Sequence, residues 1–160
     1  MIIQYDLVRD DNLKPYLKSI KDIDEDDKDQ YDEEKTIALL NRYWGLKDSI
    51  AEHNFAVAYS DMETILGIYC ISVGDYKSCD IHHRELAIFL ALIGAVSFRV
   101  FHNHPNNELV VTDADKGAAA TFKIFADILG MEFKGSFIVA KIGWKCTEDE
   151  DFICNEYEEE

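Results

Sequence analysis

Apolar residues recur at helical spacing in three stretches of the chain. Residues 32–46 begin with acids and end near Gly45, which predicts a helix that stops at this glycine. Its apolar face consists of Ile37, Leu40 and Trp44. Residues 83–95 return to helical spacing, and residues 113–130 predict a further helix that ends at Gly130. The apolar face of this last helix consists of Ala118, Phe122, Phe125 and Leu129.

Four other stretches have the composition of β-strands. Residues 1–8 predict an edge strand, and residues 54–74 hold two β-rich runs around a polar turn, which predict a hairpin. Residues 97–104 form a short apolar run before a proline and predict a buried strand, and residues 135–144 predict another strand. Because strands and helices alternate in this order, we expect an α/β fold in which helices pack on a sheet.

The charge of the chain is concentrated in two acidic segments. A chain of 160 residues suits one domain, 1–160, with a single core, and its net charge is −16. Residues 22–34 carry nine acids and one lysine, and the tail at 148–160 carries eight acids and no base. These segments are typical of a solvated loop and tail, and the alternative is a surface for a basic protein partner. No basic stripe is present, so we do not expect direct nucleic-acid binding.

Hydropathy and cysteine spacing bear on the compartment. The mean hydropathy is −0.20, and the longest apolar stretch is too short and too interrupted to cross a membrane. The first residues lack the features of a secretion signal, so we expect a cytoplasmic protein. The four cysteines form no C-x-x-C pair, which favours reduced thiols over disulfides. They are Cys70, Cys79, Cys146 and Cys154.

Two histidines at the end of the predicted strand 97–104 are candidate metal ligands. Alternate residues of a strand point to the same face, so His102 and His104 present their imidazoles to one side. Such a pair suits a divalent transition metal, zinc first, with Asp115 as a candidate third ligand. The spacing of Thr112 and Asp115 also matches a capping-box variant, which explains both residues without a metal but does not explain the histidines.

The same residues resemble a known motif. His102-Asn103-His104, seven further residues, Thr112, two residues and Asp115 resemble the JAMM motif of JAB/MPN metallopeptidases, which also has a glutamate well upstream. The wording HNHP resembles the RadC-like branch of this family. The resemblance extends over residues 18–144 and includes the stretches GLKDSIAEHNFAVAYSD and SVGDYKSCDIHHREL.

The resemblance implies an α/β (α+β) fold of the JAB/MPN kind, with a mixed central β-sheet flanked by helices, similar in architecture to cytidine deaminases. It also implies one zinc ion per chain, held by His102, His104 and Asp115, with a water at the fourth position. Glu52 matches the upstream glutamate and would be the general base. Thr112 stands where the family has serine and would stabilise the oxyanion through its hydroxyl.

Other candidates and two departures complete the prediction for the site. Glu85 is the alternative to Glu52, although an acid in the first turn of a helix is favourable without any catalytic role. His53, His82 and His83 are interpreted as structural or loop residues. The usual Ser-Gly after His-Pro is Asn106-Asn107, which still suits a turn, and the usual Asp-His before the late strand is Gly135-Ser136.

These features lead to two main hypotheses for the function. The first is a zinc-dependent metallohydrolase, a peptidase or isopeptidase-like enzyme that acts on a peptide or protein substrate. The second is a catalytically silent interaction module with the same fold. The DNA-repair label of the RadC-like branch gains no support from the acidic charge. A zinc deaminase is disfavoured because the H-x-E and P-C-x-x-C elements are missing.

Overall fold

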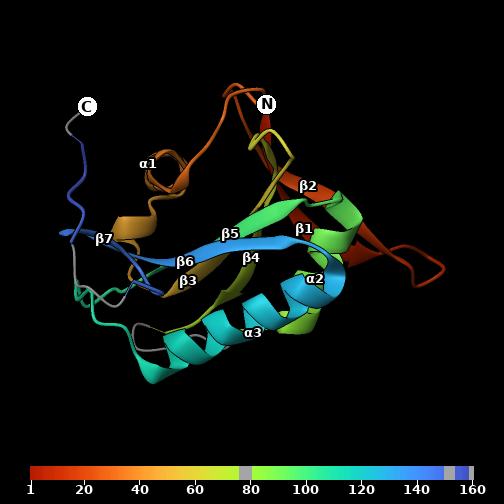
Figure 1. Cartoon of the computed structure of the whole chain (residues 1–160). Helices are drawn as coiled ribbons and strands as arrows, with labels where there is room; N and C mark the ends of the chain where they lie inside the picture. The colour runs from red at the N-terminus through yellow and green to blue at the C-terminus, as the bar shows by residue number, and fades with distance from the viewer. Residues whose placement is uncertain (76–80, 150–153, 159–160) are drawn as a thin grey trace.

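In the computed structural model, a seven-stranded mixed sheet carries helices on both faces (Figure 1). The structure describes residues 1–75, 81–149 and 154–158. The strand order is β2-β1-β4-β3-β5-β6-β7. The strands are β1 (Ile2–Arg9), β2 (Pro15–Ile23), β3 (His53–Tyr59), β4 (Ile65–Val73), β5 (Ser97–Asn103), β6 (Glu132–Ala140) and β7 (Gly143–Cys146). The helices are α1 (Glu33–Trp44), the short 3-10 helix η1 (Leu46–Asp48), α2 (His83–Ile93) and α3 (Asp113–Leu129). The predicted fold class is confirmed.

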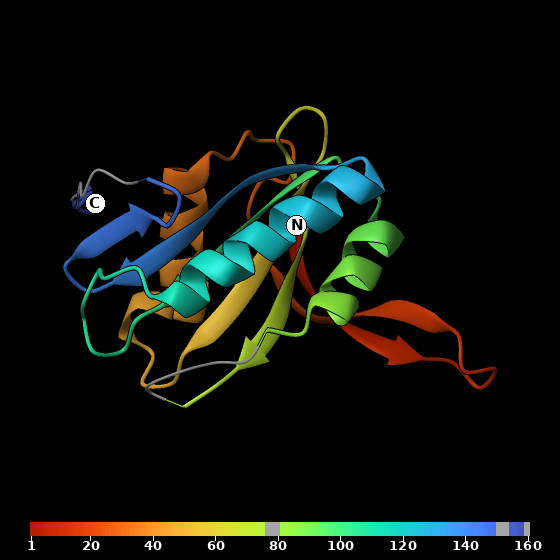
Figure 2. The ribbon, with the colours of Figure 1, turned by 60° about the horizontal axis from the view of Figure 1, so that its bottom comes forward.

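Helix α1 covers one face of the sheet, and α2 and α3 cover the other face (Figures 1 and 2). The prediction of α1 is confirmed at both ends: the side chain of Asp32 accepts a hydrogen bond from the backbone of Lys35, and Gly45 caps the last turn with φ +60°. The core under α1 includes Leu40 and Phe101. Each layer therefore buries one face of the central strands.

Strand β5 lies in the middle of this arrangement and is buried along its whole length. Phe98 and Val100 pack toward α2 and α3, whereas Phe101 packs toward α1. The predicted buried strand is therefore confirmed, and so is the predicted hairpin, which forms β3 and β4. Because β5 is fixed on both faces, residues at its carboxyl end are held on a rigid scaffold.

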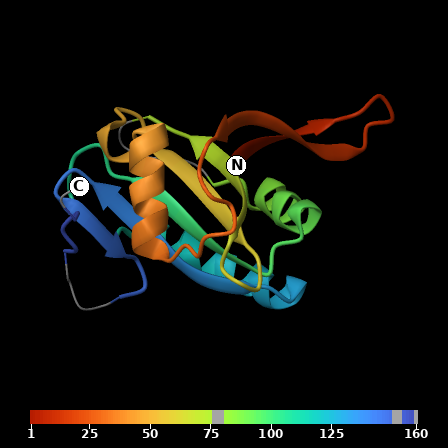
Figure 3. The same cartoon turned by 90° about the horizontal axis from the view of Figure 1, so that it is seen from above.

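The first strand is not at the edge of the sheet, so that prediction was wrong. β1 pairs antiparallel with β2 and parallel with β4, and β2 is the edge strand. Most residues of β2 are exposed, and the sequence PYLKSIKDI has no regular apolar alternation that would have revealed the strand. Figure 3 shows the β1–β2 hairpin projecting away from the rest of the sheet.

Two further predictions need correction. The stretch 135–144 contains parts of two antiparallel strands, β6 and β7, which are joined at residues 141–142. The turn itself consists of Lys141 and the exposed Ile142. Neither residue is a glycine or proline, so the sequence does not mark a turn at this point. On α3, Phe122 is buried as predicted, but Leu129 is 43% exposed, and Ala119 and Ala126 are the other buried residues.

The described parts of the acidic segments are mostly exposed, and the first segment begins at the end of β2 and runs into the start of α1. Several acids in the first segment pair locally, such as Asp29 with Lys35 and Glu25 with Arg42. The predicted tail falls partly outside the described residues, at 150–153 and 159–160, as does Cys79. No described helix combines the length and apolar character needed to cross a bilayer.

Candidate metal centre

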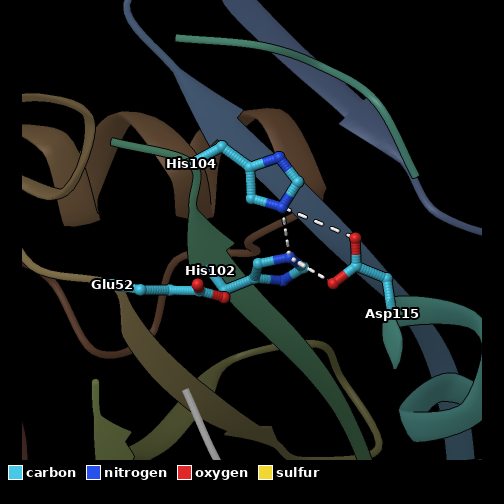
Figure 4. A group of neighbouring side chains, drawn as sticks. All are labelled: Glu52, His102, His104 and Asp115. Carbon is cyan, nitrogen blue, oxygen red and sulfur yellow. Dashed lines mark hydrogen bonds and ion pairs between the residues drawn. The ribbon is translucent and has the colours of Figure 1, made fainter. Parts of the chain in front are cut away.

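Three separate segments bring four potential metal ligands together (Figure 4). Glu52 lies directly before β3, His102 lies in β5 and His104 follows it, and Asp115 lies in the first turn of α3. One nitrogen or carboxylate oxygen from each residue lies within 4.8 Å of the others. All four residues named by the sequence as ligands or base are therefore placed in one cluster.

The three predicted ligands form a compact triangle. The Nε2 atoms of His102 and His104 are 3.1 Å apart, and they lie 3.1 and 3.5 Å from the two oxygens of Asp115. Zinc ligands at about 2.1 Å in tetrahedral geometry are about 3.4 Å from each other. The separations thus match those required around a small divalent cation.

The backbone fixes the imidazole of His104. Its Nδ1 lies 2.9 Å from the carbonyl oxygen of Glu108 and therefore donates a hydrogen bond to it. In the neutral ring this leaves Nε2, the atom that faces Asp115, unprotonated and able to bind a metal. The turn that returns Glu108 is built from Asn106 and Asn107, as expected. The Asn106 side chain accepts a hydrogen bond from the backbone of Glu108, and Asn107 adopts φ +63°.

Asp115 takes part in both of the arrangements that its spacing predicted. Its carboxylate accepts a hydrogen bond from the backbone N–H of Thr112, and the Thr112 hydroxyl accepts one from the backbone of Asp115, which forms a capping box. The same carboxylate faces the two imidazoles. The capping box is therefore what holds the Asp115 side chain in place at the cluster.

The protonation of the cluster follows from these contacts. Burial alone would raise the pKa of Asp115, but hydrogen bonds from His102 and from the protonated form of His104 outweigh burial and hold this pKa well below its ordinary value. Burial works to lower the pKa of His104, but the hydrogen bond and charge of Asp115 raise it overall. Asp115 is thus a carboxylate at neutral pH.

Glu52 is 8% exposed, which is unusual for a carboxylate. Burial raises its pKa above the ordinary value, and the nearby His102 and His104 offset this only in part. A buried carboxylate with a raised pKa, close to a group of ligands, has the properties of a proton acceptor.

Two small cavities flank the cluster, and Glu52, His104 and Thr112 line both. One, of about 250 Å³, has a mainly apolar wall and the other, of about 240 Å³, is lined by the turn after His104. The apolar wall includes Val100, Ala118 and Phe122. Ser136, at the second departure from the family pattern, also lines the first cavity, and its hydroxyl donates to Glu148.

The remaining candidates are not members of the cluster. The Glu85 carboxylate is 3.5 Å from Arg84, which fits a helix-start role. The His83 ring packs against Phe122. His53 contacts Ser49 and stacks on Phe55. None of these residues belongs to the described group of potential ligands.

Sequence reasoning missed two elements of the site. The carbonyl of Glu108 orients His104, and the side chain of Asn54 lines the first cavity. A backbone carbonyl carries no signal in the sequence, because any residue supplies one. Asn54 could have been found only from the pairing of β3 with β5, which places it beside His102.

The fold and the cluster define a class of α/β proteins with a largely buried His-x-His and Asp group at the end of a central strand. Residues 31–150 match the family described as RadC-like JAB domain, and the chain belongs to this family.

The chain is also similar to proteins of two Chlorobaculum species. The UPF0758 protein CT0611 of Chlorobaculum tepidum is 33% identical over 106 residues, which cover 65% of this chain and 47% of that protein. The UPF0758 protein of Chlorobaculum parvum is 30% identical over 110 residues, which cover 68% of this chain and 49% of that protein. The chain thus spans about half the length of these curated relatives.

Proposed function

We propose that this protein is a zinc-dependent hydrolase that cleaves amide bonds, as a peptidase or an isopeptidase-like enzyme. The observation that carries the proposal is the convergence of His102, His104, Asp115 and Glu52 between two cavities. Membership of the RadC-like JAB domain family supports the same class of chemistry.

His102, His104 and Asp115 are the residues that would hold the metal. Two imidazoles and one carboxylate are a donor set that zinc favours in catalytic sites, and three protein ligands leave a fourth position open. When bound there, zinc supplies a Lewis acid that lowers the pKa of a water toward about 7. The side chains of His102 and Asp115 are only 7% and 11% exposed, which limits contact with bulk solvent and strengthens electrostatic interactions within the site.

Glu52 would act as the general base. Its carboxylate belongs to the cluster, but Glu52 comes from a different part of the chain than the three ligands, directly before β3. Its raised pKa lets it accept the proton of the attacking water and then return that proton to the leaving amine.

Thr112 would contribute to stabilising the negative charge on the former carbonyl oxygen. Its hydroxyl oxygen accepts the N–H of Asp115, so the hydroxyl proton stays available for donation. Thr112 lines both cavities and so lies at the rim of the site. Threonine in place of serine keeps this donor and adds one methyl group.

The substrate would be a peptide or a protein whose chain extends into both cavities. The competing function is a metal-binding interaction module without turnover, which shares the cluster but makes no use of Glu52. We retain it as the second candidate because the Gly135-Ser136 segment provides few polar groups, and Ser136 is engaged by Glu148.

A comparison of zinc-loaded wild type with Glu52→Gln tests the proposal. Both proteins are assayed against a panel of peptides and isopeptide-linked proteins. We expect hydrolysis by the wild type, and a loss of at least a thousandfold in Glu52→Gln with zinc retained, because the amide cannot accept the proton. Equal turnover in the two proteins would remove Glu52 from the mechanism. No turnover by the loaded wild type would favour the interaction module.

A further inference from the structure

We propose that Asn103 is a positioning residue that fixes Glu52 relative to the two histidines. This inference rests on the proposed function. Asn103 lies between His102 and His104 in the chain and is 1% exposed. Because successive residues of a strand point to opposite faces, its side chain is directed away from the imidazoles.

The Asn103 amide binds the segment that carries Glu52. Its Oδ1 accepts a hydrogen bond of 2.7 Å from the backbone N–H of His53. Its Nδ2 donates to the carbonyls of Ala51 at 3.0 Å and Ser49 at 3.2 Å. Both amide protons and the amide oxygen are therefore used on residues that flank Glu52.

These bonds continue the sheet where its backbone pairing ends. The pairing of β3 with β5 ends at Asn54 and His102, so β5 makes no further backbone pair with the segment before β3. The Asn103 side chain takes over at the next position. On the other side, the backbone N–H of Glu52 donates to the carbonyl of Asp75, and its carbonyl accepts from Gly74. The backbone at Glu52 is thus held from two sides, and only Asn103 belongs to the strand of the histidines.

This connection has a consequence for chemistry. A general base must stay within hydrogen-bond reach of the proton that it takes, about 3 Å. Asn103 is bonded covalently to both histidines, so any movement of β5 carries the Glu52 segment with it. Asn103, which lies between the two histidines, would thereby keep Glu52 in a fixed position relative to them.

Hydrogen exchange on the metal-free protein tests the physical link. The variants are Asn103→Ala, which removes the amide, and Asn103→Asp, which keeps an acceptor for His53 but loses both donors. We expect the His53 amide to exchange at least tenfold faster in Asn103→Ala, with a smaller increase in Asn103→Asp. Thr36→Val is the control, since it removes the hydrogen bonds of the Thr36 hydroxyl to the Asp32 carbonyl and to Tyr59 on the α1 side. In Thr36→Val, the exchange rate of the His53 amide should equal that of wild type when both are compared with the amides of β4.

A double-variant experiment with cobalt tests the link to Glu52. We expect Asn103→Ala to keep cobalt affinity within about threefold of wild type, because no ligand is lost, but to alter the visible absorption of the loaded protein. The same substitution in a Glu52→Gln background should cause no additional change, because the two variants act through one carboxylate. A purely structural role would give the same spectral change in both backgrounds.

The outcomes separate the two proposals. Wild-type exchange at His53 in Asn103→Ala overturns the positioning role whether or not a metal binds, and so does a spectral change that is independent of Glu52. If wild type takes up neither cobalt nor zinc, the proposed function fails. The hydrogen-exchange result then decides alone whether Asn103 holds the Glu52 segment.

Discussion

Strand β5 carries two polar clusters, each built around one of its buried residues, and they differ in whether a cation is already present. Arg99 and His102 are both 5% exposed. The Arg99 guanidinium donates to the carbonyl of Tyr31 and lies 3.6 Å from Glu33 and 3.9 Å from Glu63. The Arg99 cluster therefore contains a cation and its own acceptors.

The cluster at the other end of β5 is built from acceptors. His102, His104, Asp115 and Glu52 supply two imidazoles and two carboxylates, and none of them carries a permanent positive charge. Burying such a group is unfavourable unless protons or a metal ion bind to it. The comparison indicates that the Arg99 cluster serves the fold, whereas the histidine cluster is suited to a cation from solution.

The largest effect is expected from Asp115→Ala, which removes one acceptor from the cluster. We expect zinc affinity to fall by at least about a hundredfold, because a ligand contributes more than the ten- to hundredfold typical of residues that only orient ligands. Titration with zinc against a competing chelator measures the change. Asp127→Ala on the same helix is the control, because Asp127 is exposed and pairs only with Lys123 among the described residues. Equal affinity in Asp115→Ala and wild type would contradict the assignment.

Arg99→Met should lower the stability of the fold and leave zinc binding intact. It removes the hydrogen bond to Tyr31 and the partner of two half-exposed acids, so we expect the free energy of unfolding to fall by about 2 kcal/mol. Urea denaturation of the metal-free protein measures this loss. Zinc affinity should remain unchanged, and a large decrease in it would show that the two clusters are not independent.

Zinc affinity should also depend on pH. Asp115 raises the pKa of His104 in the metal-free protein, so a proton competes with zinc more strongly than at a free imidazole. The free energy of unfolding that this proton contributes to the metal-free protein is present below pH 6.5 and is lost as pH rises through the raised pKa of His104. Affinity should therefore decline on acidification from a pH above 6.5, as measured by competition titrations from pH 8 to 5.5. Affinity that is constant over this range would exclude His104 as a ligand.

The smallest effect is expected at Thr112. Thr112→Ala removes the side chain that caps α3, and we expect a loss of about 1 kcal/mol in unfolding free energy with zinc still bound. Thr112→Ser keeps the hydroxyl and should restore stability. Thermal unfolding of the two variants checks this prediction, and a loss in Thr112→Ser as large as in Thr112→Ala would contradict it.

Local signals explain which parts of the fold could be predicted. Asp32, Gly45 and the apolar spacing between them define α1, and the uniformly apolar run of β5 identifies a buried strand. Strand β2 could not be predicted because its residues are exposed, and its existence depends on pairing with β1. The turn before Gly143 was missed because Lys141 and Ile142 resemble a continuing strand.

The residues of the site fall into the same two groups, those with a local sequence signal and those that depend on strand pairing. His102, His104 and Asp115 lie within one short segment, so their spacing and the family resemblance were enough to select them. Glu52 could be selected only through the resemblance, because the pairing of β3 with β5 brings it near from a distant part of the chain. The bonds made by Asn103 depend on that same pairing and could not be anticipated.

The most direct measurement is a crystal structure of the zinc-soaked protein with anomalous data collected on both sides of the zinc edge. We predict a single zinc peak between the Nε2 atoms of His102 and His104 and the carboxylate of Asp115, at about 2.1 Å from each. Glu52 should lie outside the ligand shell, within hydrogen-bond distance of a water on the metal. A structure without a peak at this position, or with zinc bound only elsewhere, would contradict the assignment of this cluster as a metal centre.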